Sequence, residues 1–227
     1  MILLPARNEA PRVGQMVRQA RDTCPGVEVV VVANGCQDDT EAQAQAAGAT
    51  VLRSEPGYGH ALLAGYHHAL QRWDQGQGPD WLVQLDADGQ HPAQAIPSLV
   101  DALREAHLVI GSRLVPGGSA GGWPAHRRWT VTALGWWTQR VSGTPVRDVS
   151  SGFQAMCPAV VQALVEDFPV DMVDANVLVR LWRLGFSVRE IGVEMVPRSG
   201  GQSMHGGLHS AVYAWRMARE AAAEARR

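Results

Sequence analysis

The sequence lacks lysine altogether and holds little cysteine. All 20 basic side chains among its 227 residues are arginine, and only three cysteines are present. A chain without lysine cannot form a Schiff base and cannot carry the lysine of a Walker-type phosphate loop. Cys24, Cys36 and Cys157 are few, odd in number and without metal-site spacing, which indicates a reducing compartment and simple packing roles.

Long apolar runs and a large net charge are also missing. No stretch approaches 18 consecutive apolar residues and no signal peptide precedes the first predicted strand, so we expect a cytoplasmic chain without membrane spans. The net charge of −2 gives no general attraction to nucleic acid. The length suits one domain with a sizeable core, and nothing in the sequence indicates the oligomeric state.

Short apolar runs alternate with amphipathic segments through the first half of the chain. The predicted strands are 1–4, 27–32, 50–52, 81–85 and 107–111. Helices are predicted at 11–24, 40–47, 59–70 and 94–105. This alternation predicts an α/β fold with a mostly parallel central sheet, right-handed crossovers and helices on both faces.

The second half of the chain is less regular. Its predicted elements are a helix at 127–141, a short strand within 148–156, helices at 158–166 and 172–184, a strand at 187–196 and an amphipathic helix at 208–227. The last helix has an apolar face that favours packing against its own domain, and an interfacial membrane helix is the alternative.

Two carboxylates follow the fourth predicted strand. Asp86 and Asp88 are two residues apart on an extended segment, so their side chains can converge on one cation. Mg²⁺ or Mn²⁺ suits such a pair when a substrate phosphate supplies further oxygens. A polar Asp-Gly turn is the plainer alternative. A calcium loop fits poorly, because its third acidic ligand is missing and its twelfth position is Pro97.

The segment Gly57-Tyr58-Gly59 has part of a dinucleotide-binding pattern. Leu62 stands where that pattern needs its third glycine, and no suitably placed acidic residue follows. We therefore interpret it as a tight turn with close backbone approach.

The segment 113–147 combines five arginines and four tryptophans with no acidic residue. A local charge of +5 in a chain of net −2 predicts an anion-binding surface. The alternative is a solvated arginine face with tryptophans in the core, and it remains the better interpretation for any single arginine. Tryptophan beside arginine is also typical of a membrane–water interface.

Six motifs follow one another along the chain. They are Pro5-Ala6-Arg7-Asn8-Glu9, Asp86-Ala87-Asp88-Gly89-Gln90-His91-Pro92, Gly111-Ser112-Arg113, Arg127-Arg128, Asp148 with Ser151-Gly152-Phe153, and Arg198 with Gly201 and Ser203. Together they resemble the motifs of inverting family-2 glycosyltransferases of GT-A fold, nearest to the dolichol- and polyprenol-phosphate mannose synthases. The resemblance runs from Leu4 to about Gly207. It implies a single domain with a nucleotide-sugar-binding half (1–112), an acceptor-side half (113–207) and a terminal helix (208–227).

The resemblance implies transfer of a hexose from a nucleoside diphosphate sugar of the GDP-mannose or UDP-glucose type. The residues implied to bind that sugar nucleotide are Pro5, Ala6, Asn8, Glu9, Asn34, Tyr58, Asp86, Ala87, Asp88 and Arg198. Those implied to hold Mg²⁺ or Mn²⁺ are Asp86, Asp88 and Gln90. Arg113 and Arg198 would help neutralise the leaving diphosphate.

The implied acceptor is a polyprenyl phosphate, held by Arg127 and Arg128 with Ser151 beside them. Its oxygen is already an anion and needs no general base. A hydroxyl acceptor would need one, and Asp148, Asp171 and Asp174 are the candidates.

Three positions depart from the family pattern. Asn34 stands where relatives have an acidic residue, and Tyr58 and Met204 stand where they have lysine. No carboxy-terminal transmembrane pair follows either, so any membrane contact is expected to be peripheral, at the inner face. A sugar nucleotidyltransferase and a catalytically silent nucleotide-binding protein remain as alternative functions.

Overall fold

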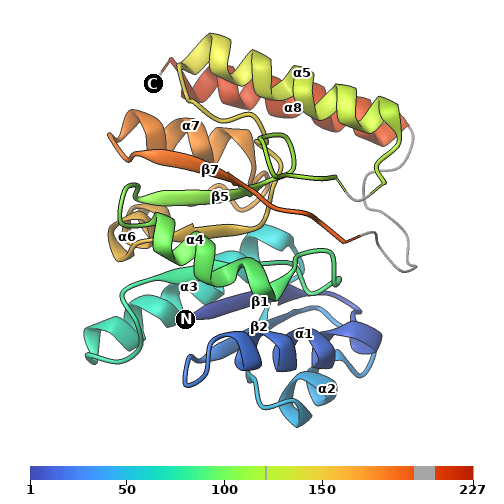
Figure 1. Cartoon of the computed structure of the whole chain (residues 1–227), viewed down its shortest axis with the longest axis vertical. Helices are drawn as coiled ribbons and strands as arrows, with labels where there is room; N and C mark the ends of the chain where they lie inside the picture. The colour runs from blue at the N-terminus through green and yellow to red at the C-terminus, as the bar shows by residue number, and fades with distance from the viewer. Residues whose placement is uncertain (121, 197–207, 227) are drawn as a thin grey trace.

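The computed structural model describes residues 1–120, 122–196 and 208–226, and the side chains of the last range from residue 215 onward. Within these ranges the chain forms helices on both sides of one central sheet (Figure 1).

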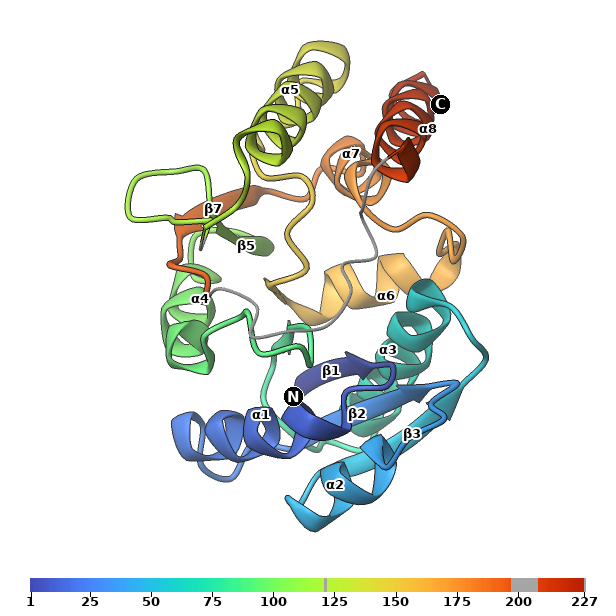
Figure 2. The same cartoon turned by 90° about the vertical axis from the view of Figure 1, so that its right-hand side faces the viewer.

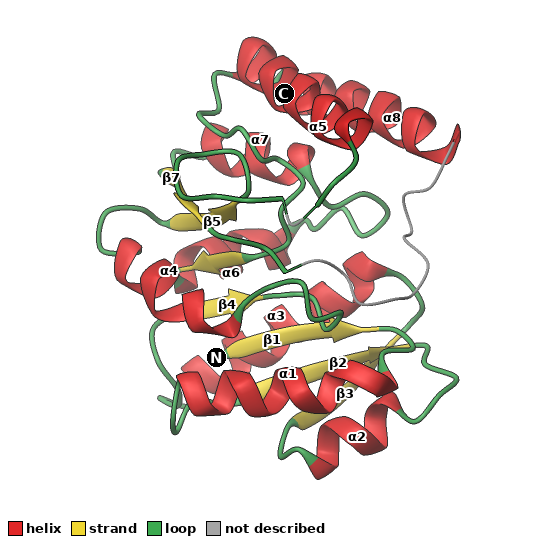
Figure 3. Cartoon of the chain, turned by 45° about the vertical axis from the view of Figure 1, so that its right-hand side comes forward, coloured by secondary structure: helices red, strands yellow, loops and turns green. Residues whose placement is uncertain are grey.

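The sheet has seven strands in the order β3-β2-β1-β4-β6-β5-β7. Figure 3 labels all of these strands except β6. The strands are β1 (Ile2–Ala6), β2 (Val29–Asn34), β3 (Thr50–Ser54), β4 (Leu82–Gln84), β5 (Leu108–Ser112), β6 (Gln154–Met156) and β7 (Val188–Gly192). β6 is antiparallel to both of its neighbours, β4 and β5, whereas the remaining pairs are parallel. The predicted α/β class with a mostly parallel sheet is confirmed.

The helices of the described chain match the predicted order. They are α1 (Ala10–Thr23), α2 (Thr40–Ala46), α3 (Tyr58–Asp74), α4 (Ile96–Ala102), α5 (Ala125–Ser142), α6 (Pro158–Glu166), α7 (Ala175–Arg183) and α8 (Leu208–Glu224). A short 3₁₀ turn, η1 (Ala93–Ala95), leads into α4, so the predicted helix at 94–105 is shorter than expected.

Alternate residues of β1 show how the sheet is buried on both faces. Leu3 belongs to the core formed with Leu62 and Tyr66 of α3, whereas Ile2 and Leu4 belong to the core formed with α1. This follows from the two-residue period of a strand. All three β1 side chains are fully buried, and each such side chain contributes roughly 1.5–3 kcal/mol of transfer free energy.

The predicted strand at 187–196 ends early, at Gly192. A Cβ at Gly192 would lie 2.2 Å from the Pro116 carbonyl oxygen, because residues 116–118 cross the chain there. Beyond that crossing Ser119 and Glu194 form an isolated bridge. The sequence alternation continues past Gly192, but the strand does not.

The helices α5 and α8 lie side by side at the end of the molecule remote from α2 (Figures 1 and 2). Leu134 of α5 and Met217 and Ala221 of α8 enter the core that α3, α6 and α7 share. The indole N–H of Trp137 donates to the Ala218 carbonyl oxygen at 3.4 Å. α8 therefore packs against its own domain, as predicted. In the part of the chain that the structure describes, no helix has the length and apolar character needed to cross a membrane.

Candidate active site

A cleft of about 1390 Å³ lies beyond the carboxyl ends of β1, β2 and β4. The last residues of β1 and β2, Ala6 and Asn34, line it together with Asp86 in the turn after β4. Its lining then continues onto α5, α7 and α8. Parallel strands that end together leave such a crevice, which is the usual ligand site of open α/β sheets. We call the part at the strand ends the carboxylate end and the part on α5, α7 and α8 the helical end.

The carboxylate end is built on the turn after β4. Asp86 and Asp88 are partly exposed and line the cleft, while Ala87 between them is buried. The Asp88 Oδ1 accepts the backbone N–H of Gln90 at 3.0 Å, and Gly89 takes a left-handed φ of 82° that glycine tolerates best. The turn thus presents both carboxylates on one side.

The buried side chain of His91 stabilises this turn. The backbone N–H of Asp86 donates to Nδ1 of His91 at 2.9 Å, and the imidazole stacks on Phe153 with ring centroids 5.2 Å apart. Burial lowers the pKa of His91 to about 4. The ring is therefore neutral at pH 7, accepts at Nδ1 and has its proton on Nε2, which lies 3.9 Å from the Asp86 carboxylate.

Tyr58 also lines the carboxylate end and contacts this turn. Its hydroxyl donates to Oδ1 of Asp86 at 3.2 Å. Burial, followed by the charge of Asp86, raises the pKa of Tyr58 well above its usual value, so the phenol stays protonated. Gly59 allows this approach, because a Cβ there would lie 2.2 Å from the Val170 carbonyl oxygen. The predicted tight turn thereby brings α3 against the loop that holds Asp171 and Asp174.

Asn34 and the turn at 5–9 close the carboxylate end. The Asn34 side-chain oxygen accepts the backbone N–H of Gly57 at 2.6 Å. Asn8, with a left-handed φ of 56°, accepts the backbone N–H of Gln37 at 2.8 Å. The hydroxyl of Thr40 accepts the backbone N–H of Glu9 at 2.8 Å. The loops after β1 and β2 are thus joined by hydrogen bonds.

Between the two ends lies a buried ion pair. Arg113 donates from Nε and Nη2 to Asp148 at 2.7 and 2.6 Å, and its backbone N–H donates to the same carboxylate at 2.9 Å. Asp148 is fully buried. Its own backbone N–H and that of Arg147 donate to the carboxylate of Glu190. Such a two-pronged pair fixes the guanidinium in one orientation.

Trp123 lies between two guanidinium groups. The Arg113 Cζ is 4.1 Å from its ring centroid and the Arg127 Cζ is 4.3 Å from it. Cation–π contacts of this kind stabilise by about 0.5–2 kcal/mol each. Asp148 fixes Arg113, and Arg113 in turn contacts the Trp123 ring. The ring therefore helps to position Arg127 at the helical end.

The rest of the helical end is largely apolar. Its lining includes Val131 and Leu134 of α5, Leu178 of α7 and Met217 of α8, with Arg216 beside them. This end therefore pairs guanidinium groups with an apolar wall, whereas the carboxylate end is polar.

A family model described as glycosyl transferase family 2 matches residues 1–168. The chain belongs to glycosyl transferase family 2. It is therefore a glycosyltransferase, and the resemblance predicted from its motifs is confirmed.

Two curated relatives agree with this assignment. The chain is 32% identical over 224 residues to the undecaprenyl-phosphate mannosyltransferase of Micrococcus luteus, covering 92% of this chain and 88% of the relative. It is 30% identical over 223 residues to the polyprenol monophosphomannose synthase of Mycolicibacterium smegmatis, covering 91% and 81%.

Among solved structures, this glycosyltransferase resembles glucosyl-3-phosphoglycerate synthase from Mycobacterium tuberculosis in complex with Mn²⁺, UDP-glucose and phosphoglyceric acid. The TM-score is 0.70 at 20% identity, covering 99% of this chain and 79% of that one. At this identity the likeness supports the fold alone, and the expected GT-A fold is confirmed.

The structure brings most of the predicted site residues of this glycosyltransferase to the one cleft. Its lining includes the following predicted residues: Pro5, Ala6, Asn8, Glu9, Asn34, Tyr58, Asp86, Ala87, Asp88, Gln90, Arg113, Arg127, Ser151, Asp171 and Asp174. Residues from eight separate segments of the chain thus line this cleft.

Three predicted residues are placed differently. Asp148 is buried against Arg113, and Arg128 is exposed on α5; neither is among the described residues that line the cleft. Ser151 lines it, but its hydroxyl donates to the Gly111 carbonyl oxygen at 2.6 Å. Arg198, with Gly201, Ser203 and Met204, lies outside the described residues.

The sequence analysis missed Trp123, His126 and Arg216 as cleft residues. Trp123 and His126 lie in segment 113–147, which the sequence analysis interpreted as an anion-binding surface only as a whole. Arg216 carried no motif at all, because its place depends on how α8 packs.

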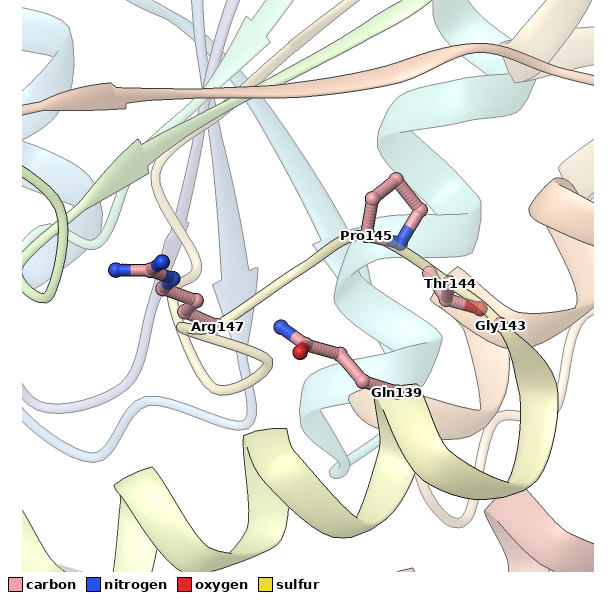
Figure 4. Close-up of a pocket in the computed structure, with 5 residues that line it drawn as sticks. All are labelled: Gln139, Gly143, Thr144, Pro145 and Arg147. Carbon is pink, nitrogen blue, oxygen red and sulfur yellow. The ribbon is translucent and has the colours of Figure 1, made fainter.

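A smaller hollow of about 310 Å³ lies elsewhere, between α5 and the loop that follows it (Figure 4). Gln139, Thr144, Pro145 and Arg147 surround it, with Gly143. The Gln139 amide already donates to the Val146 carbonyl oxygen at 2.9 Å. None of the described residues lining it is acidic.

The carboxylate end fits a divalent cation of the Mg²⁺ or Mn²⁺ kind. The described residues contain no group of three or more His, Cys, Asp or Glu side chains that could enclose a metal. Asp86 and Asp88, with the Gln90 amide nearby, supply a sparse oxygen set. Mg²⁺ accepts such a set, because it keeps waters and takes the remaining oxygens from a substrate phosphate. The residues suit a metal that binds together with a diphosphate.

Proposed function

We propose that this enzyme transfers a hexosyl group from a nucleoside diphosphate sugar to a polyprenyl phosphate, with inversion and with Mg²⁺ or Mn²⁺. The observation that carries the proposal is the division of one cleft into a carboxylate end and a helical end. The names of the two curated relatives support the same acceptor class and favour a mannosyl group. The sugar nucleotide would be of the GDP-mannose or UDP-glucose type.

The carboxylate end would hold the sugar nucleotide. The carboxyl ends of β1 and β2 and the loop after β1, with Pro5, Ala6, Asn8, Glu9 and Asn34, would form the rim for the base and ribose. Asp86, Asp88 and Gln90 would hold the metal ion, which supplies positive charge to the leaving diphosphate. Arg198 is proposed to assist there.

Arg113 would add a fixed positive group beside the reacting centre. It lines the cleft, and its pairing with Asp148 holds it in place without reorganisation. We assign Asp148 the role of positioning Arg113, because a fully buried carboxylate that accepts three N–H donors is poorly placed to take a proton. This role replaces the general-base role considered from the sequence.

Arg127 would bind the acceptor phosphate. Guanidinium binds phosphate through two parallel hydrogen bonds, and Trp123 stacks on its face. The phosphate oxygen is an anion at neutral pH, so it attacks the anomeric carbon without a base. A bond from that oxygen to the anomeric carbon forms as the bond to the diphosphate breaks, and nucleoside diphosphate leaves. The apolar wall of Val131, Leu134 and Met217 would cover the first part of the prenyl chain.

A hydroxyl acceptor is the second candidate. It rests on Asp171 and Asp174, which line the cleft and are partly or fully exposed. Either carboxylate would serve as the general base that a hydroxyl requires.

A matched pair of acceptors tests the proposal. Transfer from labelled GDP-mannose and UDP-glucose is measured with a short-chain polyprenyl phosphate and with the polyprenol of the same chain length, with Mn²⁺ and with excess chelator. The proposal predicts a glycosylated product and nucleoside diphosphate from the phosphate alone, and only with metal. Product from the polyprenol would favour the hydroxyl mechanism, and full turnover in chelator would exclude metal dependence.

A further inference from the structure

One hydrogen bond at the carboxylate end links α3 to the turn after β4. The Tyr58 hydroxyl donates to Oδ1 of Asp86 at 3.2 Å, and both side chains line the cleft. The backbone of Asp86 is held separately, because its N–H donates to the imidazole of His91 at 2.9 Å. Tyr58 therefore restrains the rotation of the carboxylate, in addition to the restraint that His91 places on the backbone.

The backbone that carries Tyr58 is itself fixed on both sides. The Gly57 N–H donates to the side-chain oxygen of Asn34 at 2.6 Å. On the other side Gly59 lies against the Val170 carbonyl oxygen, where a Cβ would have only 2.2 Å. The phenol thus leaves the first residue of α3 between two held neighbours. It has little freedom to follow a carboxylate that rotates, so it can impose one orientation on it.

Gly152 lies directly beside this hydrogen bond. A Cβ at residue 152 would lie 3.0 Å from the Tyr58 hydroxyl oxygen and 3.4 Å from both carboxylate oxygens of Asp86. Gly152 does not have a positive φ, so its backbone conformation is open to alanine. The position therefore needs glycine for space and not for conformation. The space that it leaves is taken by the contact between the phenol and the carboxylate.

The backbone on either side of Gly152 is anchored to β5. The Ser151 hydroxyl donates to the Gly111 carbonyl oxygen at 2.6 Å, and the Gly111 N–H donates to the Phe153 carbonyl oxygen at 2.8 Å. Both Ser151 and Phe153 are buried. Close-packed, hydrogen-bonded backbone of this kind yields little to an added methyl group. An alanine at residue 152 would therefore disturb the phenol–carboxylate contact more than its own backbone.

We propose that Tyr58 is a positioning residue that orients Asp86 toward the divalent cation, and that Gly152 keeps the space this contact requires. The inference rests on the proposed role of Asp86 in holding the metal. Hydrogen bonds to a metal-binding carboxylate orient it, and loss of such a partner lowers metal affinity by about 10- to 100-fold. Tyr58 thus acts through Asp86, in place of the sugar-nucleotide contact that the resemblance implies for it.

Nucleotide titration of the full chain at several Mn²⁺ concentrations tests this role without any transfer reaction. UDP and GDP are titrated by calorimetry, with excess chelator and with increasing Mn²⁺, which gives the Mn²⁺ affinity of the nucleotide-bound protein. Tyr58→Phe keeps the ring and removes only the hydroxyl, so Mn²⁺ affinity should fall by about 10-fold or more. Nucleotide affinity in chelator should stay unchanged, because the phenol acts on the metal carboxylate.

Two further variants separate the contact from general effects on the fold. Gly152→Ala keeps both side chains of the contact, so it should weaken Mn²⁺ binding in the same way while also leaving nucleotide affinity in chelator unchanged. Tyr66→Phe is the matched control. It removes a buried hydroxyl of the same helix that donates to Gln84, and it should bind Mn²⁺ as the wild type does. Thermal unfolding shows that each variant is folded.

The outcomes distinguish this inference from the function on which it rests. Wild-type Mn²⁺ affinity in Tyr58→Phe would overturn the positioning role alone. So would a loss of nucleotide affinity in chelator, because Tyr58 would then contact the nucleotide directly. An equal loss of Mn²⁺ affinity in Tyr66→Phe would show a general effect of α3 and would also overturn it. A wild-type protein whose nucleotide binding does not respond to Mn²⁺ would contradict the proposed metal role itself, and the inference with it.

Discussion

The two ends of the cleft hold their polar groups in different ways. At the carboxylate end, side chains are tied to the backbone of neighbouring strand ends: Asp88 to Gln90, and Asn34 to Gly57. At the helical end, Arg127 stacks on an indole, and the cleft lining includes apolar side chains from three helices.

This difference suits two different ligands. A sugar nucleotide is compact and polar, so recognition by groups fixed with hydrogen bonds gives orientation and stabilises the developing charge. A polyprenyl phosphate needs one oriented contact to its phosphate and an apolar surface that accommodates its chain. The pair of Arg113 and Arg127, with Trp123 between them, connects the two ends. Substitutions at the carboxylate end should therefore change mainly the kinetics with the sugar nucleotide, and substitutions at the helical end mainly the kinetics with the acceptor.

The largest effect is expected at the carboxylate end. Asp88→Asn should lower transfer by about 1000-fold or more, because it removes the charge of a proposed metal ligand. The asparagine oxygen still accepts the Gln90 N–H, so the turn and the fold should persist. Transfer rates with Mn²⁺ and thermal unfolding of the same preparation check this. Full turnover by the variant would contradict a metal role for Asp88.

Substitution of the buried ion pair between the two ends should mainly lower the free energy of unfolding. Asp148→Asn removes the charge that a largely buried Arg113 faces, and breaking such a pair costs about 3–5 kcal/mol in the free energy of unfolding. Denaturant unfolding at pH 7 measures it. Asp101→Asn, whose partner Arg104 is exposed, is the matched control and should cause no measurable change. Equal stability of both variants would show that the buried pair contributes little.

Trp123→Ala should affect the helical end selectively. Loss of the cation–π contact, about 0.5–2 kcal/mol, should raise the KM for polyprenyl phosphate by roughly 2- to 30-fold. The KM for the sugar nucleotide should change much less. Trp123→Phe keeps an aromatic face and should restore most of the acceptor affinity. Parallel increases in both KM values would point to general disruption of the cleft.

The smallest effect is expected at Asn34. Asn34→Asp keeps an oxygen to accept the Gly57 N–H, so the fold should be unchanged. The added charge should alter sugar-nucleotide affinity by about 1 kcal/mol or less, and unequally between GDP- and UDP-sugars. Nucleotide titration with Mn²⁺ measures the change. Identical affinities before and after would place Asn34 outside the nucleotide pocket.

The sequence predicted the carboxylate end better than the helical end, for a physical reason. Strand periodicity and strand-end motifs are local, and parallel strands place their carboxyl ends together, so Asp86, Asp88 and Asn34 could be expected to meet. The helical end depends on how α5 and α8 pack, which no local pattern specifies. Arg127 and Arg128 were therefore grouped, although one faces the cleft and the other faces outward.

The positions of the tryptophans also depend on helix packing, which the sequence pattern does not specify. The alternatives for the four tryptophans of 113–147 were core filling or an exposed interface. The structure exposes Trp129 and Trp136 and places Trp123 in the cleft, so one compositional signal covered two roles. Asp148 was weighed as a base because charge is visible in a sequence, whereas burial and pairing are not.

The adjacent arginines of α5 allow the most direct test of the central claim, that the helical end binds an acceptor phosphate. Arg127→Gln and Arg128→Gln are compared in transfer to a short-chain polyprenyl phosphate in detergent, beside nucleotide titration of the same proteins. Arg127→Gln should lose about 1.5–3 kcal/mol, roughly 10- to 150-fold, in kcat/KM for the acceptor with unchanged nucleotide affinity. Arg128→Gln should behave as the wild type does. Equal acceptor kinetics in the two variants would contradict the assignment of the helical end to the acceptor.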